Sequence, residues 1–280
     1  MNSKRFINCR GNLLDLSTPV VMGIVNITSD SFYATSRCKN DTEILKRVET
    51  IINEGGKIID IGAISSRPDA EDMTVEEEIN RLIPALQLIR NKFPEIVVSV
   101  DTYQAIVAQR AVNEGEADII NDISGGEIDK SMFDTIAELN VPYILTHIKG
   151  NPKTMQINPH YQDIISEIML FFAKKLNLLR MSGVKDVIID PGFGFGKNIN
   201  HNYSLLKNLH EFKIFELPVM VGISRKSMIY KTLNTTIEQC LNGTTVLNTI
   251  SLLGGAKILR VHDVKEAVES VTLTQKLLQS

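Results

Sequence analysis

The stretch IVVSVDTYQAIVAQRAVNEGEADIIND, residues 96–122, decides the fold of this chain. Its two ends, Ile96–Asp101 and Asp118–Asp122, are short runs that are mostly apolar and rich in β-branched residues. Such runs are typical of parallel strands that are covered on both faces. The segment between them reads as a helix. The stretch therefore predicts a strand, a crossover helix and a second parallel strand, which together form a βαβ unit.

The same unit recurs along the chain. Between Asn26 and His262, one strand end follows another on average about every 34 residues, the size of a βαβ repeat. The predicted strands are Val20–Asn26, Lys57–Gly62, Ile96–Asp101, Asp118–Asp122, Val141–His147, Asp186–Asp190, Pro218–Ile223 and Ala256–His262. Eight units in a row are expected to close into a (β/α)₈ TIM barrel, and 280 residues suit one. An open doubly wound sheet is the alternative, but no dinucleotide-binding glycine fingerprint follows the first strand.

Residues 1–18 precede the first barrel strand. Within them, FINCRGNLLDL, residues 6–16, contains a turn at Arg10-Gly11-Asn12 and predicts a β-hairpin that covers the bottom of the barrel. Neither a linker nor a low-complexity stretch interrupts the sequence. We therefore expect one domain over residues 1–280.

Composition and charge exclude several classes of partner and metal site. A net charge of −3 without a basic cluster gives no reason to expect a nucleic acid partner. The N-terminus lacks the apolar core of a signal peptide, and no run approaches about 18 apolar residues, so we expect no membrane partner. The three cysteines, Cys9, Cys38 and Cys240, are widely spaced and predict reduced thiols in the cytoplasm. Without an HExxH motif or a Cys/His cluster, zinc is not expected.

Polar residues mark the end of one predicted strand after another. They are Asn26, Asp101, Asn121, Asp122, His147, Asp190, Ser224, Arg225, Lys226, Arg260 and His262. Any single one could be an ordinary turn residue. In a barrel, however, the carboxyl ends of all the strands meet at one mouth, which is where such enzymes keep their chemistry. The strand ends therefore predict an active site.

This set of residues carries both signs of charge. The groups suited to anionic oxygens are Arg67, Arg225, Lys226, Arg260 and His262. Arginine in particular fits phosphate, because its fork donates two parallel hydrogen bonds. Asp101, Asn121 and Asp190 instead suit a neutral heterocycle that has N–H donors and ring acceptors. Together the two groups predict an aromatic base that carries a phosphate or diphosphate.

Seven motifs then make a specific family resemblance. In order, they are GIVNITSDSF, SSRP, VSVDT, INDISG, DPGFGFGKNINHNYSLL, GISRKSM and RVHDV. From about Phe6 to its C-terminus, the chain resembles the dihydropteroate synthases, which are pterin-binding TIM-barrel transferases of folate biosynthesis and targets of sulfonamides. The resemblance implies condensation of 6-hydroxymethyl-7,8-dihydropterin diphosphate with p-aminobenzoate, giving 7,8-dihydropteroate and pyrophosphate. It also implies a homodimer.

The resemblance assigns a role to each matching residue. Those implied to hold the pterin are Asp101, Asn121, Asp190 and Lys226. Asn26 is implied to bind a Mg²⁺ on the diphosphate, which Arg67, Arg260 and His262 help to neutralise. Those implied to flank p-aminobenzoate are Ser66, Pro68, Phe195 and Ser227. Asp101, Arg67 and Lys226 are the expected catalytic residues.

Several positions depart from the family pattern. Ser29 replaces a usual proline, and Asp69 a usual glycine. Ala63-Ile64 stands where glycine and glutamate are common, and Ser66 where threonine is. Thr146, Ile148 and Lys149 alter the usual M-H-M-Q stretch around His147. These changes bear on loop dynamics and sulfonamide affinity more than on the reaction, because the motifs of the pterin pocket are intact.

Three other functions are compatible with a barrel of this kind. A pterin- or folate-binding module of the corrinoid methyltransferase type shares the barrel, but it expels no diphosphate and need not keep both SRKS and RVH. A Schiff-base aldolase would want an inward lysine within a strand, whereas Lys226 follows one, beside Arg225. A purely structural barrel leaves the polar strand ends unexplained.

Overall fold

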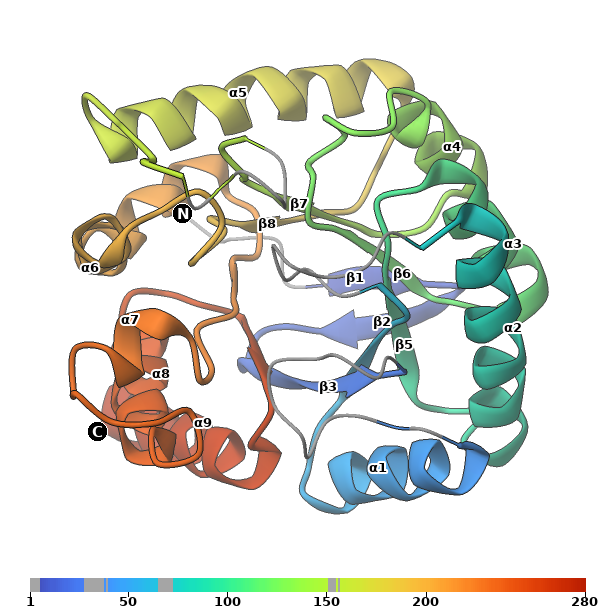
Figure 1. Ribbon diagram of the computed structural model, residues 1–280, viewed down its shortest axis with the longest axis horizontal. Helices are drawn as coiled ribbons and strands as arrows, with labels where there is room; N and C mark the ends of the chain where they lie inside the picture. Colours follow the sequence, from blue (N-terminus) through green and yellow to red (C-terminus); the bar gives the residue numbers. More distant parts are fainter. Residues whose placement is uncertain (1–5, 28–37, 39, 65–72, 151–154, 156) are drawn as a thin grey trace.

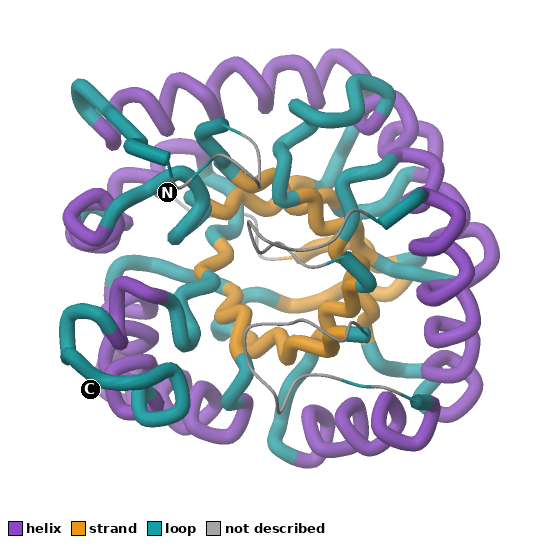
Figure 2. Tube along the Cα trace, in the orientation of Figure 1, coloured by secondary structure: helices purple, strands orange, loops and turns teal. Residues whose placement is uncertain are grey.

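The computed structural model describes residues 6–27, 38, 40–64, 73–150, 155 and 157–280. Within them, a ring of eight parallel strands is surrounded by helices (Figures 1 and 2). The strands are β3 (Val20–Asn26), β4 (Ile58–Gly62), β5 (Val97–Asp101), β6 (Ile119–Asp122), β7 (Tyr143–Thr146), β8 (Val187–Asp190), β9 (Met220–Val221) and β10 (Ile258–Val261). Each overlaps one of the predicted strands, and the predicted (β/α)₈ barrel is confirmed.

The ring closes between β8 and β9, which a single bridge joins. Its strand order is β8-β7-β6-β5-β4-β3-β10-β9, and a parallel bridge between Ile189 and Val219 joins β8 to β9. At this seam the Ile189 N–H donates to the Pro218 carbonyl over 3.0 Å. β9 is shorter than predicted, and one reason is that Pro218 has no N–H to add to the ladder. Closure pairs the backbone N–H and C=O groups that the edge strands of an open sheet would leave exposed.

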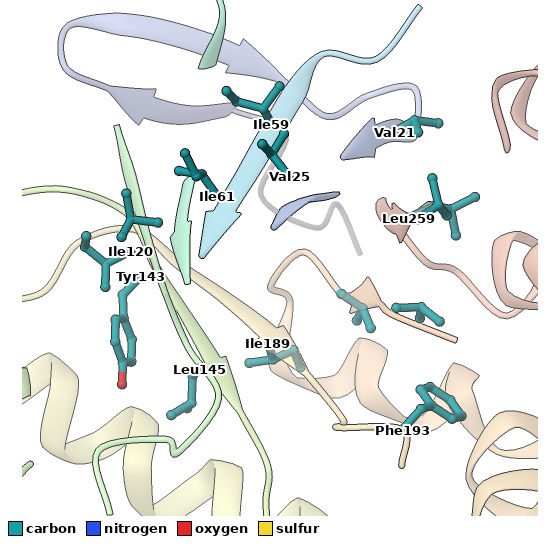
Figure 3. Packing of buried hydrophobic residues seen from close by; sticks show 14 of the residues in the cluster. Val21, Val25, Ile59, Ile61, Ile120, Tyr143, Leu145, Ile189, Phe193 and Leu259 are labelled. Atoms are coloured by element: carbon teal, nitrogen blue, oxygen red, sulfur yellow. The ribbon is translucent and has the colours of Figure 1, made fainter. Parts of the chain in front are cut away.

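The helices cover the outer face of this ring. They are α1 (Asp41–Asn53), α2 (Val75–Lys92), α3 (Ala105–Gly115), α4 (Met132–Leu139), α5 (Ile164–Ser182), α6 (Ile199–Lys207), the 3₁₀ helix η2 (Leu209–Phe215), α7 (Ser227–Tyr230), α8 (Leu241–Leu253) and α9 (Val264–Gln279). Strand residues such as Ile59, Leu145 and Leu259 are buried in the same cluster as apolar helix residues (Figure 3). Side chains alternate in direction along a strand, so the residues that precede and follow these outward residues on each strand point into the barrel.

An N-terminal hairpin plugs the bottom of the barrel, as predicted. Its strands, β1 (Phe6–Cys9) and β2 (Asn12–Asp15), pair antiparallel around a turn in which Arg10 and Gly11 have φ of 51° and 93°. Three buried residues of this segment, Ile7, Cys9 and Leu16, belong to the same cluster as one inward residue from each of seven barrel strands. We call those seven the bottom layer: Met22, Ile58, Ile119, Ile144, Ile188, Met220 and Ile258.

The barrel interior becomes polar above the bottom layer, towards the carboxyl ends of the strands. Two residues further along β4, β6, β7, β8 and β10, and two residues beyond the partly buried Val97 of β5, the side chains on the same inner face form what we call the polar layer: Asp60, Ser99, Asn121, Thr146, Asp190 and Arg260. The corresponding residues in β3 and just after β9 are Ile24 and Gly222. Five of the six residues of the polar layer are almost completely buried, and the sixth, Arg260, is partly buried. Buried polar groups require partners. The polar layer is therefore the candidate location of the active site.

Candidate active site

Arg260 lies between two carboxylates at the centre of the polar layer. Its Nε donates to Asp60 Oδ2 over 2.6 Å, and its Nη2 donates to Asp101 Oδ2 over 2.9 Å. Asp60 also accepts from the Ser99 hydroxyl at 2.7 Å and from Asn121 Nδ2 at 3.1 Å. Residues from β4, β5, β6 and β10 thus share one network.

Asp60 was missed by the sequence analysis, although a signal for it exists. It is a charged residue in the middle of the run KIIDIG, and aspartate is rarely buried without a partner. In the structure it is completely buried, and it orients Arg260 from below. Arg260 therefore reaches the mouth as a braced side chain, not as a free surface cation.

Two carboxyl groups of the site have raised pKa values. Burial raises the pKa of Asp101 to about 7, against the opposing charge of Arg260. Burial also raises the pKa of Asp190, against the charge of Lys226. The cations of the protein therefore compensate only part of the cost of burying these carboxylates. N–H donors from a bound molecule would supply further compensation.

Lys226 and Phe195 lie next to each other in the structure. The Lys226 ammonium donates to the Phe193 carbonyl and lies 4.6 Å from the centroid of the Phe195 ring. Burial lowers the pKa of Lys226 to about 8, and the charge of Asp190 works against that shift. Ser227 follows as the first residue of α7 and is half-buried.

A second buried lysine, Lys197, holds the glycine-rich loop that carries Phe195. Its Nζ donates to the carbonyls of Gly192 (2.8 Å) and Phe195 (3.0 Å) and lies 2.9 Å from Nδ1 of His147. Gly192 has a φ of 73°, and a Cβ there would come within 1.9 Å of the His147 carbonyl oxygen. Only glycine fits so close to β7. Lys197 was not predicted as a site residue, because the sequence does not show that the loop folds back on this side chain or that His147, 50 residues away, lies beside it.

Arg225 corrects one sequence-based expectation. Its guanidinium forms a two-fold ion pair with Asp263, with Nε and Nη2 each 2.8 Å from a carboxylate oxygen. Nη1 donates to the carbonyls of Ile237 (2.7 Å) and Glu238 (3.0 Å). The side chain is buried and its donors are engaged, so Arg225 braces the segment after β9 instead of binding an anion. The prediction that it belongs to the anion-binding cations is wrong.

His262 and Asn26 stand on neighbouring strand ends. Nδ1 of His262 lies 3.1 Å from the Ser224 hydroxyl, which also accepts the His262 backbone N–H at 3.2 Å. Burial, together with Arg260 and other nearby cations, lowers the pKa of His262 to about 3. The ring is therefore neutral near pH 7 and can offer a hydrogen bond but no charge. Asn26 ends β3, which pairs with β10.

Several predicted or unusual positions remain to be placed. Ser66, Arg67 and Pro68, and with them Ser29 and Asp69, lie outside the described residues. Lys149 forms a 2.7 Å ion pair with Glu167 of α5 and lies 4.1 Å from the centroid of the Tyr161 ring. The described residues contain no group of three or more His, Cys, Asp or Glu side chains that could hold a metal. No helix among them is long and apolar enough to cross a bilayer.

Comparisons with known proteins agree with this geometry. Residues 22–262 match the family model of pterin binding enzymes. A dihydropteroate synthase of Escherichia coli strain K12 is 42% identical, covering 97% of this chain and 96% of that protein. One from Haemophilus influenzae is 40% identical over 94% and 95% of the two chains.

Solved structures give the same result. A Yersinia pestis dihydropteroate synthase in complex with a sulfonamide drug superimposes with a TM-score of 0.94 at 37% identity, covering 98% of this chain and all of that one. A Coxiella burnetii dihydropteroate synthase in complex with pteroic acid superimposes with a TM-score of 0.87 at 31% identity, over 99% and 98% of the two chains.

Proposed function

This chain belongs to the dihydropteroate synthase family of pterin-binding enzymes, and from that premise we propose how its residues carry out the reaction. The enzyme is a transferase that condenses 6-hydroxymethyl-7,8-dihydropterin diphosphate with p-aminobenzoate to give 7,8-dihydropteroate and pyrophosphate. The proposal takes residues 1–280 as one pterin-binding domain. The observation that carries it is the polar layer, in which buried carboxyl groups lie next to a braced arginine.

The pterin ring binds to the acidic half of the site. Asp101 and Asp190 offer carboxylate oxygens to ring N–H and amino groups. The Nδ2 of Asn121 donates a hydrogen bond to Asp60, while its Oδ1 is buried and has no partner among the described residues. An acceptor of this kind matches an N–H on the ring. Lys226, next to Asp190, covers the ring from the side of Phe195.

The diphosphate binds to the cations Arg260 and Arg67, and the neutral ring of His262 adds a hydrogen bond. The bond between the exocyclic carbon of the pterin and the diphosphate oxygen breaks, and its electron pair leaves with the diphosphate. The carbon left behind is electron-poor, and the carboxylate of Asp101 stabilises it. The aniline nitrogen of p-aminobenzoate bonds to that carbon and releases a proton to solvent. Its low pKa makes a strong base unnecessary.

p-Aminobenzoate is flanked by Ser66, Pro68, Phe195 and Ser227 in this proposal. Of the four, Phe195 and Ser227 are among the described residues, and they lie on the two segments that Lys226 connects. The ring of Phe195 offers a flat apolar face. Ser227, at the start of α7, offers a hydroxyl for the carboxylate of the substrate.

Asn26 fits the role of Mg²⁺ ligand. Mg²⁺ takes hard oxygen ligands, keeps several waters and draws much of its coordination from substrate phosphates, with few ligands from the protein. The amide oxygen of Asn26 at the end of β3, on the strand next to Arg260 and His262, would supply one such oxygen. When bound, Mg²⁺ neutralises charge on the leaving diphosphate.

A homodimer is proposed through α8 and α9. A groove between these helices is lined by Leu241, Thr245, Leu273 and Leu277, among others. Further large apolar side chains of the two helices are exposed, namely Val246, Ile250, Leu253 and Leu278. A second copy related by a two-fold axis would bury the same patch on both chains. Sedimentation analysis of Leu273→Glu, with Ile214→Glu as an exposed control on η2, tests this surface.

The enzyme is proposed to act in the cytoplasm. Cys9, Cys38 and Cys240 are buried and free, and burial raises the pKa of the Cys9 thiol to about 12 and that of Cys38 to about 11. Such thiols are unreactive, and they form no disulfide framework of the kind that secreted domains use.

One reaction tests the proposed function. The purified protein is incubated with the dihydropterin diphosphate, Mg²⁺ and p-aminobenzoate, and dihydropteroate and pyrophosphate are measured. Both products are expected in equal amounts, and Asp101→Asn is the matched inactive control. Binding of a methylated folate without any pyrophosphate release would instead favour the corrinoid methyltransferase type of module.

A further inference from the structure

Thr146 occupies a prominent place on the inner wall of the barrel. It is the last residue of β7, and its Cα partner in the parallel ladder is Asp190 of β8. Ile144, two residues earlier, points into the bottom layer. Because side chains alternate along a strand, Thr146 points into the polar layer beside Asp190.

The hydroxyl of Thr146 is buried and unsatisfied within the part of the chain that the structure describes. The residue is only 1% exposed, and its Oγ1 has no hydrogen-bond partner among the described residues. A buried hydroxyl without a partner destabilises the folded protein, since it has given up its bonds to water. In the polar layer Asn121 Oδ1 shares this condition. Two unsatisfied atoms on the inner faces of β6 and β7 indicate that something bound in the mouth supplies their partners.

We propose that the Thr146 hydroxyl determines specificity in this enzyme by hydrogen-bonding the polar edge of the pterin ring next to Asp190. The inference rests on the proposed function and adds a contact to it. At this position the chain departs from the usual M-H-M-Q stretch, so the contact uses a group that a methionine side chain does not have.

The chemistry of the two groups is complementary. A threonine hydroxyl both donates and accepts, whereas the carboxylate of Asp190 only accepts. The heterocycle carries N–H groups as well as ring nitrogen and carbonyl acceptors, so a donor beside an acceptor can bind adjacent ring atoms. β-Branching also restricts χ1 of Thr146, which limits the entropy lost when the hydroxyl binds.

A pair of variants isolates the hydroxyl. Thr146→Val keeps the shape and removes the hydroxyl, and Thr146→Ser keeps the hydroxyl. Calorimetric titration with the dihydropterin diphosphate should show Thr146→Val binding about fivefold to tenfold more weakly than wild type. Thr146→Ser should stay within about twofold, and affinity for pyrophosphate with Mg²⁺ should be the same in all three. Thr146→Ala replaces the valine variant if that variant does not fold.

Thermal unfolding distinguishes a binding role of the Thr146 hydroxyl from a structural role. Removing an unsatisfied hydroxyl should leave the melting temperature of Thr146→Val equal to or above that of wild type, even though its affinity falls. Equal affinity in Thr146→Val and wild type would overturn the inference, and so would an equal loss in the valine and serine variants. If wild type itself fails to bind the dihydropterin diphosphate, the proposed function fails instead.

Discussion

Ile188 and Asp190 lie on the same inner face of β8, two residues apart, but they belong to different halves of the barrel. Ile188 belongs to the bottom layer, whose residues cluster with those of the N-terminal hairpin segment. Asp190 lies in the polar layer, where burial raises its pKa and Lys226 offsets only part of that cost. The difference teaches that one strand can serve stability at its start and, in the proposed function, substrate binding only two residues later.

The largest effect is expected at Asp190. Asp190→Asn should weaken binding of the dihydropterin diphosphate about a thousandfold, roughly 4 kcal/mol, because an amide loses charge-assisted hydrogen bonds to ring N–H groups. The melting temperature should change little, since an amide oxygen can still accept the Gly192 N–H, now 2.8 Å from Oδ1. Calorimetry and thermal unfolding measure both quantities. A large loss of stability with retained affinity would make Asp190 a structural cap.

Ile188→Ala should show the reverse pattern. Removing a completely buried side chain from the bottom layer should lower the free energy of unfolding by about 3 kcal/mol. Ligand affinity of the folded variant should stay at the wild-type value. Urea denaturation checks the first expectation, with Ile214→Ala as a control because Ile214 is 69% exposed. Weakened binding in Ile188→Ala would show that the two halves are coupled.

Glu78 extends the comparison to the helices behind the mouth. It is buried on α2, and burial raises its pKa to about 7, with a further contribution from Asp101. A raised carboxyl pKa destabilises the folded state increasingly as pH rises from about 4.5 to 7, and fully above that. Glu78→Gln should therefore be more stable than wild type at pH 8 by on the order of 2–3 kcal/mol, and equal near pH 4.5. Equal unfolding curves at pH 8 would contradict this.

The smallest effect concerns the charge of Lys226. With a pKa of about 8 in the free protein, the ammonium is mostly protonated at pH 7 and mostly neutral at pH 8.5. Affinity for the anionic substrate should therefore fall about fourfold between these pH values. In Lys226→Met, which cannot titrate there, the pH profile should be flatter over this range. Titrations at several pH values compare the two slopes, and identical slopes would assign the titration to another group.

Much of this site could be predicted from local sequence. The run KIIDIG predicts a strand, Asp101 and Asp190 each end such a run, and Asn121 is the last residue but one of another. Strand periodicity and barrel closure then bring these residues to one mouth. The roles of Ser66, Arg67 and Pro68 stay predictions, because these residues lie outside the described part of the chain.

The sequence by itself determined the strands, their order around the barrel, the hairpin plug and the residues that gather at the mouth, because apolar periodicity and turn chemistry are local properties of the chain. Only the tertiary structure decided which charges pair. Arg260 meets Asp60 across 200 residues of sequence and Asp101 across 159, whereas Arg225, next to Lys226 in sequence, turns away to Asp263. Whether a buried cation stabilises the fold or remains able to bind a substrate depends on which carboxylates lie within a few ångströms of it. The spacing of residues along the chain does not contain that information.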